Sequence, residues 1–135
     1  MSAEGDVRMI TKLFGVFSRG DVESILAALT DDFDWQGPVS EHAGCLAWGG
    51  RRRGREQVAE YFRGFAATSR WHPMEDAIFT AADHGVVVEG RNRNEARSTG
   101  RSYEHQWVMV FTITDGRIAR FRHYYDPADI TRAHE

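Results

Sequence analysis

The chain has 135 residues, of which 41% are hydrophobic and 12% aromatic, and only three are proline. This length and composition predict one globular domain over residues 1–135 and exclude a disordered chain or a two-domain enzyme. Seventeen basic and twenty acidic residues leave a net charge of −3, too weak a field to hold nucleic acid or an anionic membrane surface.

The N-terminal region predicts a helical hairpin. Gly20 ends a first helix over about residues 6–18, and Asp21 is a natural N-cap for a second, short helix. Charged residues interrupt this region too often for a signal peptide or a membrane span, and a single cysteine excludes an internal disulfide. We therefore expect a cytoplasmic protein. The apolar stripe of the first helix recurs at helical spacing: Val7, Ile10, Leu13, Phe14 and Phe17.

The next segment alternates between short extended and helical patterns. Residues 33–36 alternate apolar and polar side chains, which predicts a short strand at a sheet edge. Residues 39–54 lack any period and predict a surface loop that ends in an arginine run. A third helix follows from Arg55 to about Thr68, with Val58, Tyr61, Phe62 and Phe65 on one face.

The second half of the chain is predicted to form β-strands. Runs of β-branched and aromatic residues are separated by turn signals such as Asp115-Gly116. They predict an antiparallel four-strand meander with strands at about 74–81, 86–95, 101–114 and 117–126. Helices first and a sheet second is an α+β arrangement, in which the sheet wraps around the helices.

Strand alternation assigns the faces of the last two strands. Phe121, His123 and Tyr125 share one face, and we expect that face to meet the helices. In the preceding strand His105, Trp107 and Met109 share a face, while valines lie on the opposite one. Valines on an outer face favour a homodimer through that face.

For the strand after His84, alternation leaves two possibilities open. Either Val86, Val88, Gly90 and Asn92 face the helices, or Val87, Glu89, Arg91 and Arg93 do. Composition alone does not choose between them.

The order of these elements and their motifs resembles the nuclear-transport-factor-2-like (NTF2-like) superfamily, and within it the ketosteroid-isomerase-related, SnoaL-like proteins. The resemblance covers nearly the whole chain. It implies a cystatin-like α+β cone, in which about three N-terminal helices pack on a curved, mostly antiparallel sheet of unequal strands around a hydrophobic pocket. The motifs that carry it are Gly20-Asp21, Asp31-Asp32-Phe33, Gly54-Arg55-Glu56-Gln57-Val58 and Asp115-Gly116-Arg117-Ile118.

The chain departs from ketosteroid isomerase at the residues that carry out catalysis. The resemblance puts the general-base aspartate at Gly37, the oxyanion tyrosine at Leu13 and its partner aspartate near Met109. Steroid isomerisation by that mechanism is therefore not expected. The resemblance also implies that Glu89 and Arg91 point into the cone.

Four residues are candidates for proton transfer or for orienting a reacting group. Glu89 and Arg91 share a face, where a guanidinium can hold a carboxylate that acts as a base, or the two form a structural pair. His123 is either a proton shuttle near neutral pH or a core histidine bonded to a backbone carbonyl, and His105 has the same alternatives.

Aromatic and apolar side chains are candidates for ligand contact, although such residues are more often plain core. Trp71 belongs with them, and the Tyr61 and Tyr125 hydroxyls are possible oxyanion donors. Glu41, His42 and Cys45 are metal-ligand types at close spacing, but with no second cluster we expect no metal site. The predicted ligand-binding residues are Trp35, Tyr61, Phe62, His105, Trp107, Met109, Phe121 and Tyr125.

The leading hypothesis is a cofactor-independent isomerase, cyclase, dehydratase or hydrolase acting on a small hydrophobic molecule. In it, Glu89 and His123 transfer protons and Arg91 orients the carboxylate. The alternatives are a module that binds a hydrophobic metabolite without catalysis, and a dimeric interaction module whose pocket is filled by its own aromatic side chains.

Overall fold

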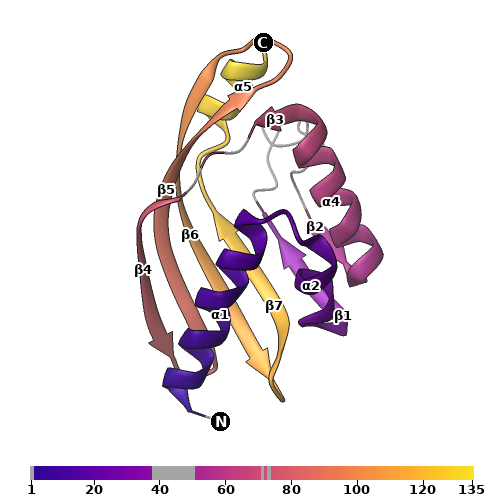
Figure 1. Cartoon of the computed structure of the whole chain (residues 1–135), viewed down its shortest axis with the longest axis vertical. Coiled ribbons are helices and arrows are strands. Elements are labelled where there is room, and N and C mark those ends of the chain that lie inside the picture. The colour runs from indigo at the N-terminus through magenta and orange to yellow at the C-terminus, as the bar shows by residue number, and fades with distance from the viewer. Residues whose placement is uncertain (1, 38–50, 71, 73) are drawn as a thin grey trace.

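Helices and one curved sheet form the part of the chain that the computed structural model describes, residues 2–37, 51–70, 72 and 74–135 (Figure 1). The helices are α1 (Ala3–Ser18), α2 (Val22–Ala27), α4 (Gly54–Thr68) and α5 (Ala128–His134). The strands are β1 (Leu29–Gln36), β2 (Arg51–Arg53), β3 (Ser69–Arg70), β4 (Glu75–Ala82), β5 (Gly85–Ala96), β6 (Ser102–Thr114) and β7 (Arg117–Tyr124).

The sheet has the order β2-β1-β7-β6-β5-β3, with β4 also paired to β5. Strands β4 to β7 pair in succession and antiparallel, which confirms the predicted meander, whereas β1 pairs parallel with β7. At the β6–β7 turn, Asp115 and Gly116 both have left-handed backbone angles, with φ of 51° and 76°. Two consecutive residues of this kind form a type I′ turn, whose twist matches that of the flanking strands.

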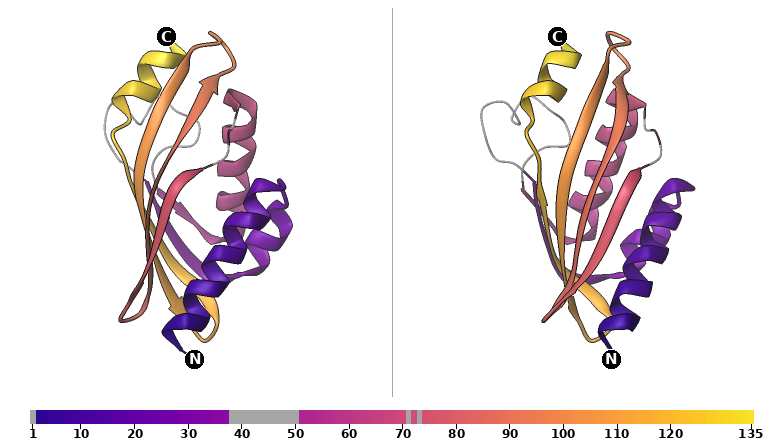
Figure 2. Two further views of the ribbon diagram at one scale, coloured as in Figure 1. Left: turned by 60° about the vertical axis from the view of Figure 1, so that its left-hand side comes forward. Right: turned by 90° about the vertical axis from the view of Figure 1, so that its left-hand side faces the viewer.

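Helices α1, α2 and α4 lie on the concave side of the sheet, and α5 lies apart from them at the end of the β5–β6 hairpin (Figures 1 and 2). Helix α1 lies against β4 and β5, and α4 lies against β1. Both helices carry fully buried side chains, Ile10 on α1 and Val58 on α4. This is the expected α+β cone, because neither the amphipathic helices nor the sheet can bury its apolar side alone.

Helix α5 was not predicted, because its seven residues carry too few apolar positions for a helical period. It buries Ile130 and Ala133, and its His134 side chain contacts the carbonyl oxygens of Ile130 and Thr68 at 2.8 and 3.3 Å. The C-terminal helix is thereby joined to the end of α4. No described helix is long and apolar enough to cross a bilayer.

Alternation along β6 and β7 follows the expectation from the sequence. His105, Trp107, Phe121 and His123 are buried on the inner face. Tyr124, one residue from His123, is 59% exposed on the outer face. Side chains inside the cone therefore come from alternate positions of neighbouring strands.

Candidate functional site: an apolar cavity with a buried histidine pair

The concave face of the sheet and the helices line a small cavity of about 80 Å³. Its wall comes from α1, α2, α4, β1, β6 and β7 together with Met74, and none of the described residues that line it carries a carboxylate, ammonium or guanidinium group. Five of the predicted ligand-binding residues line it: Trp35, Tyr61, Phe62, Met109 and Phe121.

His123 is the histidine in this wall. Strand β7 places it on the inner face, opposite Met109 of β6, and the residue is 5% exposed. Its Nε2 atom is buried without a hydrogen-bond partner. An imidazole nitrogen that has lost water and gained no protein partner is costly, so a ligand group that reached this atom would restore a hydrogen bond.

His105 lies next to His123, and Tyr125 packs against both. The two imidazole centroids are 5.4 Å apart, and the Tyr125 ring lies 4.7 Å from His105 and 4.5 Å from His123. The Nε2 atom of His105 is also buried and unpartnered. His105, Tyr125 and Trp107 share the inner face but stand beside the cavity rather than in its wall.

Burial controls the protonation of this cluster. It lowers the pKa of His105 to about 4, and burial together with the neighbouring His105 places the pKa of His123 well below its usual range. Burial also raises the pKa values of the Tyr61 and Tyr125 hydroxyls. Near neutral pH the site therefore holds two uncharged imidazoles and two protonated phenols.

Glu89 and Arg91 do not join this cluster, and the expectation that they point into the cone is wrong. Val86 and Val88, at the alternate positions of β5, are both fully buried, so Glu89 and Arg91 lie on the outer face. The reason is burial: two valines gain more by leaving water than an ion pair does.

On the outer face, Arg91 forms ion pairs with acidic neighbours. Its guanidinium lies 3.0 Å from Asp76, 3.9 Å from Glu75 and 3.7 Å from Glu104. Glu89 and Arg91 line an open hollow on this side of the sheet, together with Gln106, Val108 and Tyr124.

The same alternation brings Asn92 and Asn94 inside, which the sequence reasoning did not single out. Asn92 accepts a hydrogen bond from Trp107 Nε1 at 2.9 Å and donates one to Asn94 Oδ1 at 2.8 Å. The sequence could have indicated this, because Asn92 and Asn94 occupy the same alternate positions of the strand as Val86 and Val88. The amides hold the Trp107 indole beside the histidine pair.

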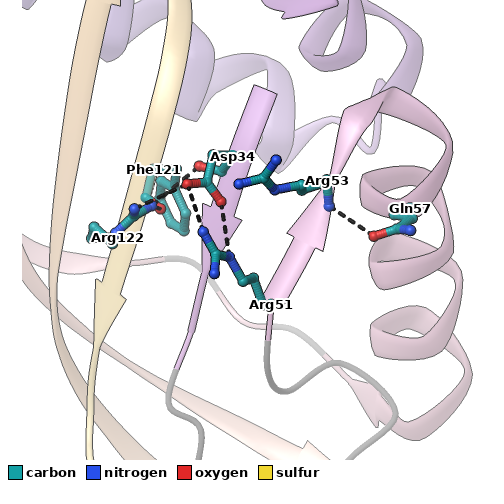
Figure 3. Close-up of polar contacts among 6 residues, drawn as sticks. All are labelled: Asp34, Arg51, Arg53, Gln57, Phe121 and Arg122. Carbon is teal, nitrogen blue, oxygen red and sulfur yellow. Dashed lines mark hydrogen bonds and ion pairs between the residues drawn. The ribbon is translucent and has the colours of Figure 1, made fainter. Parts of the chain in front are cut away.

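The arginine run at the start of α4 is structural. Arg55 donates hydrogen bonds to the carbonyl oxygens of Leu26 and Leu29 and pairs with Asp31 at 2.7 Å. Arg51 and Arg122 both pair with Asp34, at 3.3 and 3.1 Å (Figure 3). These two guanidiniums lower the pKa of the Asp34 carboxyl and tie β1 to β2 and β7.

The remaining predictions concern the other catalytic positions and the metal-ligand types. Gly37 is buried just after β1, and Leu13 and Met109 line the cavity, so the positions of the isomerase's catalytic groups hold no polar side chain. Glu41, His42, Cys45 and Trp71 lie outside the described residues.

A curved sheet wrapped around helices, with a cavity between them, defines the NTF2-like class of α+β cones. Within that class, a family model described as "SnoaL-like domain" matches residues 10–121, and the chain belongs to this family. Among curated proteins, none matches the chain.

Several solved structures have the same fold. An NTF2-like protein of unknown function from Burkholderia pseudomallei is 26% identical over 98% of each chain, with a TM-score of 0.87. A "putative isomerase" from Bacillus subtilis is 20% identical over 98% of this chain and 95% of its own, with a TM-score of 0.82. A "putative polyketide cyclase" from Xanthomonas campestris is 22% identical over 99% of this chain and 100% of its own, with a TM-score of 0.77.

Proposed function

We propose that the protein is a cofactor-independent acid/base enzyme, of the isomerase or cyclase type, that acts on a small hydrophobic molecule bound in the cavity. The observation that carries the proposal is the unpartnered Nε2 atom of His123 in an otherwise apolar wall. The names of the Bacillus and Xanthomonas structures agree with this reaction class. The cytoplasmic location stays a prediction from the sequence.

In this proposal His123 takes a proton from the bound molecule and returns it at a second position. The imidazole is neutral near pH 7, so it can accept a proton without first losing one. The apolar side chains around the cavity offer water few hydrogen-bond partners, which limits its competition for that proton. Tyr61 also lines the cavity, and in this proposal its hydroxyl donates to an oxygen that becomes negative during the transfer.

Proton transfer can be tested without knowing the natural substrate. Small neutral ketones would first be screened for binding by ligand-observed NMR, and the exchange of their α-protons for deuterium would then be followed in D₂O. We expect the wild-type protein to accelerate exchange. His123→Gln, which keeps hydrogen-bonding capacity but cannot carry the proton, should bind the ketone and lose at least about a hundredfold in exchange rate.

His84→Gln is the matched control, because it removes an exposed imidazole from the β4–β5 turn. This variant should exchange at the wild-type rate. Undiminished exchange in His123→Gln would show that another group transfers the proton.

The alternative function is binding without catalysis, and the lowered pKa of His123 favours it, because a weakly basic imidazole is a poor proton acceptor. In that case the wild-type protein would bind ketones tightly and leave their α-protons in place. The same experiment therefore separates the two functions.

We also propose a homodimer through the outer face of the sheet. At its centre this face carries Val108, Val110 and the exposed Tyr124. Strand β5 carries Arg91 and Arg93 beside Glu89 on this face, so charges of both signs flank the valines. A two-fold axis through the valines would bury them against their copies in the second protomer.

A further inference from the structure

The cavity wall restricts the charge of what can bind there. Apart from His123, its described members contribute aliphatic, aromatic and thioether groups, with polar atoms on Trp35 and Tyr61. Arg122, next to His123 on β7, points to the opposite face, where it pairs with Asp34. An anion placed in the cavity would lose its water and meet no counterion in this wall.

Arg52 is the cation to consider near the wall, because its charge acts on the Tyr61 hydroxyl. Its guanidinium, however, lies 4.0 Å from the Glu60 carboxylate and is not part of the wall. The charge of Arg52 is therefore already partly balanced, and a carboxylate in the cavity would have to compete with Glu60 for it.

The histidine pair supplies hydrogen bonds in place of charge. Each neutral imidazole has one N–H donor and one acceptor nitrogen, and the Nε2 atoms of both rings are buried without partners. A hydroxyl or carbonyl oxygen at His123 would restore a hydrogen bond that the fold leaves unmade. A purely apolar ligand would leave this nitrogen unpaired, as it is in the fold without ligand, and would gain no hydrogen bond from it.

We propose that the ligand is an uncharged compact molecule with an apolar body and one hydroxyl or carbonyl group, and that this group hydrogen-bonds Nε2 of His123. Carboxylates and phosphate esters are excluded. This inference rests on the proposed function for the location of the site and adds the chemical class of the ligand. The cavity of about 80 Å³ limits the rigid body to about one small ring unless side chains move.

Three benzene derivatives of similar size test the proposal: toluene, phenol and benzoate, titrated by NMR near neutral pH. In a purely apolar cavity toluene would bind more tightly than phenol, because the phenol hydroxyl loses its water without replacement. We expect the reverse order, with phenol about five- to tenfold tighter than toluene and benzoate at least tenfold weaker than phenol.

The His123→Phe variant should keep the affinity for toluene and lose the preference for phenol, whereas His84→Phe should behave as wild type. Benzoate binding equal to that of phenol would overturn the proposal, and its loss in Arg52→Gln would identify the cation responsible. A preference for toluene in the wild-type protein would also overturn it. Tight benzoate binding or a preference for toluene would still show that the cavity binds small molecules, so the proposed function would stand. Failure to bind any of the three probes would overturn the proposed function as well.

Discussion

His105 and His123 show how position determines the chemistry of a side chain. Both imidazoles lie on the inner face of neighbouring strands, among aromatic rings and away from carboxylates. A protonated imidazole needs water or a counterion to stabilise its charge. Burial removes the water, and no carboxylate of the described residues lies beside either ring to replace it. The pair is therefore held neutral, which suits a site for uncharged molecules.

Acid should destabilise the protein through these histidines. An unfolded chain protonates histidine near pH 6.5, whereas folded His105 does so only near pH 4. Between these values the unfolded state binds more protons, so the free energy of unfolding falls as pH falls. The full shift corresponds to about 3 kcal/mol for His105.

Urea denaturation at about pH 7.5 and about pH 5 measures this dependence. His105→Phe should lose less stability than wild type between the two conditions, because it has no proton to bind. The exposed His84→Phe should follow the wild-type curve. Identical pH dependence in His105→Phe and wild type would refute the assignment.

The packing around Gly90 leaves no room for a side chain. A Cβ built there would lie 2.6 Å from two carbons of the Trp107 indole, and the hydrogen bond from its Nε1 to Asn92 restrains the ring. Gly90→Ala should therefore displace the indole and lower stability by about 1–3 kcal/mol, with a shifted tryptophan fluorescence maximum. Arg93→Ala, on the exposed face of the same strand, should do neither; an unshifted spectrum in Gly90→Ala would contradict the packing described.

At the scale of elements, Arg55 holds two helices and a strand in one arrangement. Its guanidinium satisfies carbonyl oxygens at the end of α2 and the start of β1 while its backbone belongs to α4. The guanidinium carries five donors spread over a planar fork and can reach acceptors that lie apart, whereas the three donors of an ammonium group share one nitrogen. The helices that line the cavity are thereby fixed relative to one another.

Arg55→Lys should lower the free energy of unfolding by about 1–3 kcal/mol, because partly buried carbonyl groups would lose their partners. Arg63→Lys changes an exposed arginine of the same helix and should have little effect. Chemical denaturation of the two variants provides the comparison. Equal stability would mean that water replaces the Arg55 contacts.

For the whole molecule, the outer sheet face is the surface that the helices leave uncovered (Figure 2). Sedimentation at micromolar concentration should give a dimer, and Val108→Lys should give a folded monomer, because a buried unpaired charge is incompatible with the interface. Ala67→Lys, exposed on α4, should remain dimeric. A wild-type monomer under these conditions would end the proposal.

Local patterns in the sequence were sufficient for most elements. Helical spacing located α1 and α4, and turn residues such as Asp115-Gly116 delimited the β4 to β7 meander. Alternation placed His123 and Phe121 inside the cone. These features depend on residues close together in the chain, where side-chain period and turn chemistry act directly.

The sequence by itself therefore determined the α+β class, the succession of strands and the inner face of β6 and β7. Only the tertiary structure decided which face of β5 points inward, and with it that His105 rather than Glu89 accompanies His123. That choice depends on the combined burial of Val86, Val88 and Asn92 against other strands and helices. Contacts between residues distant in the chain leave no pattern in the nearby sequence. The residues that meet in the site could therefore be identified only from the three-dimensional structure of the sheet.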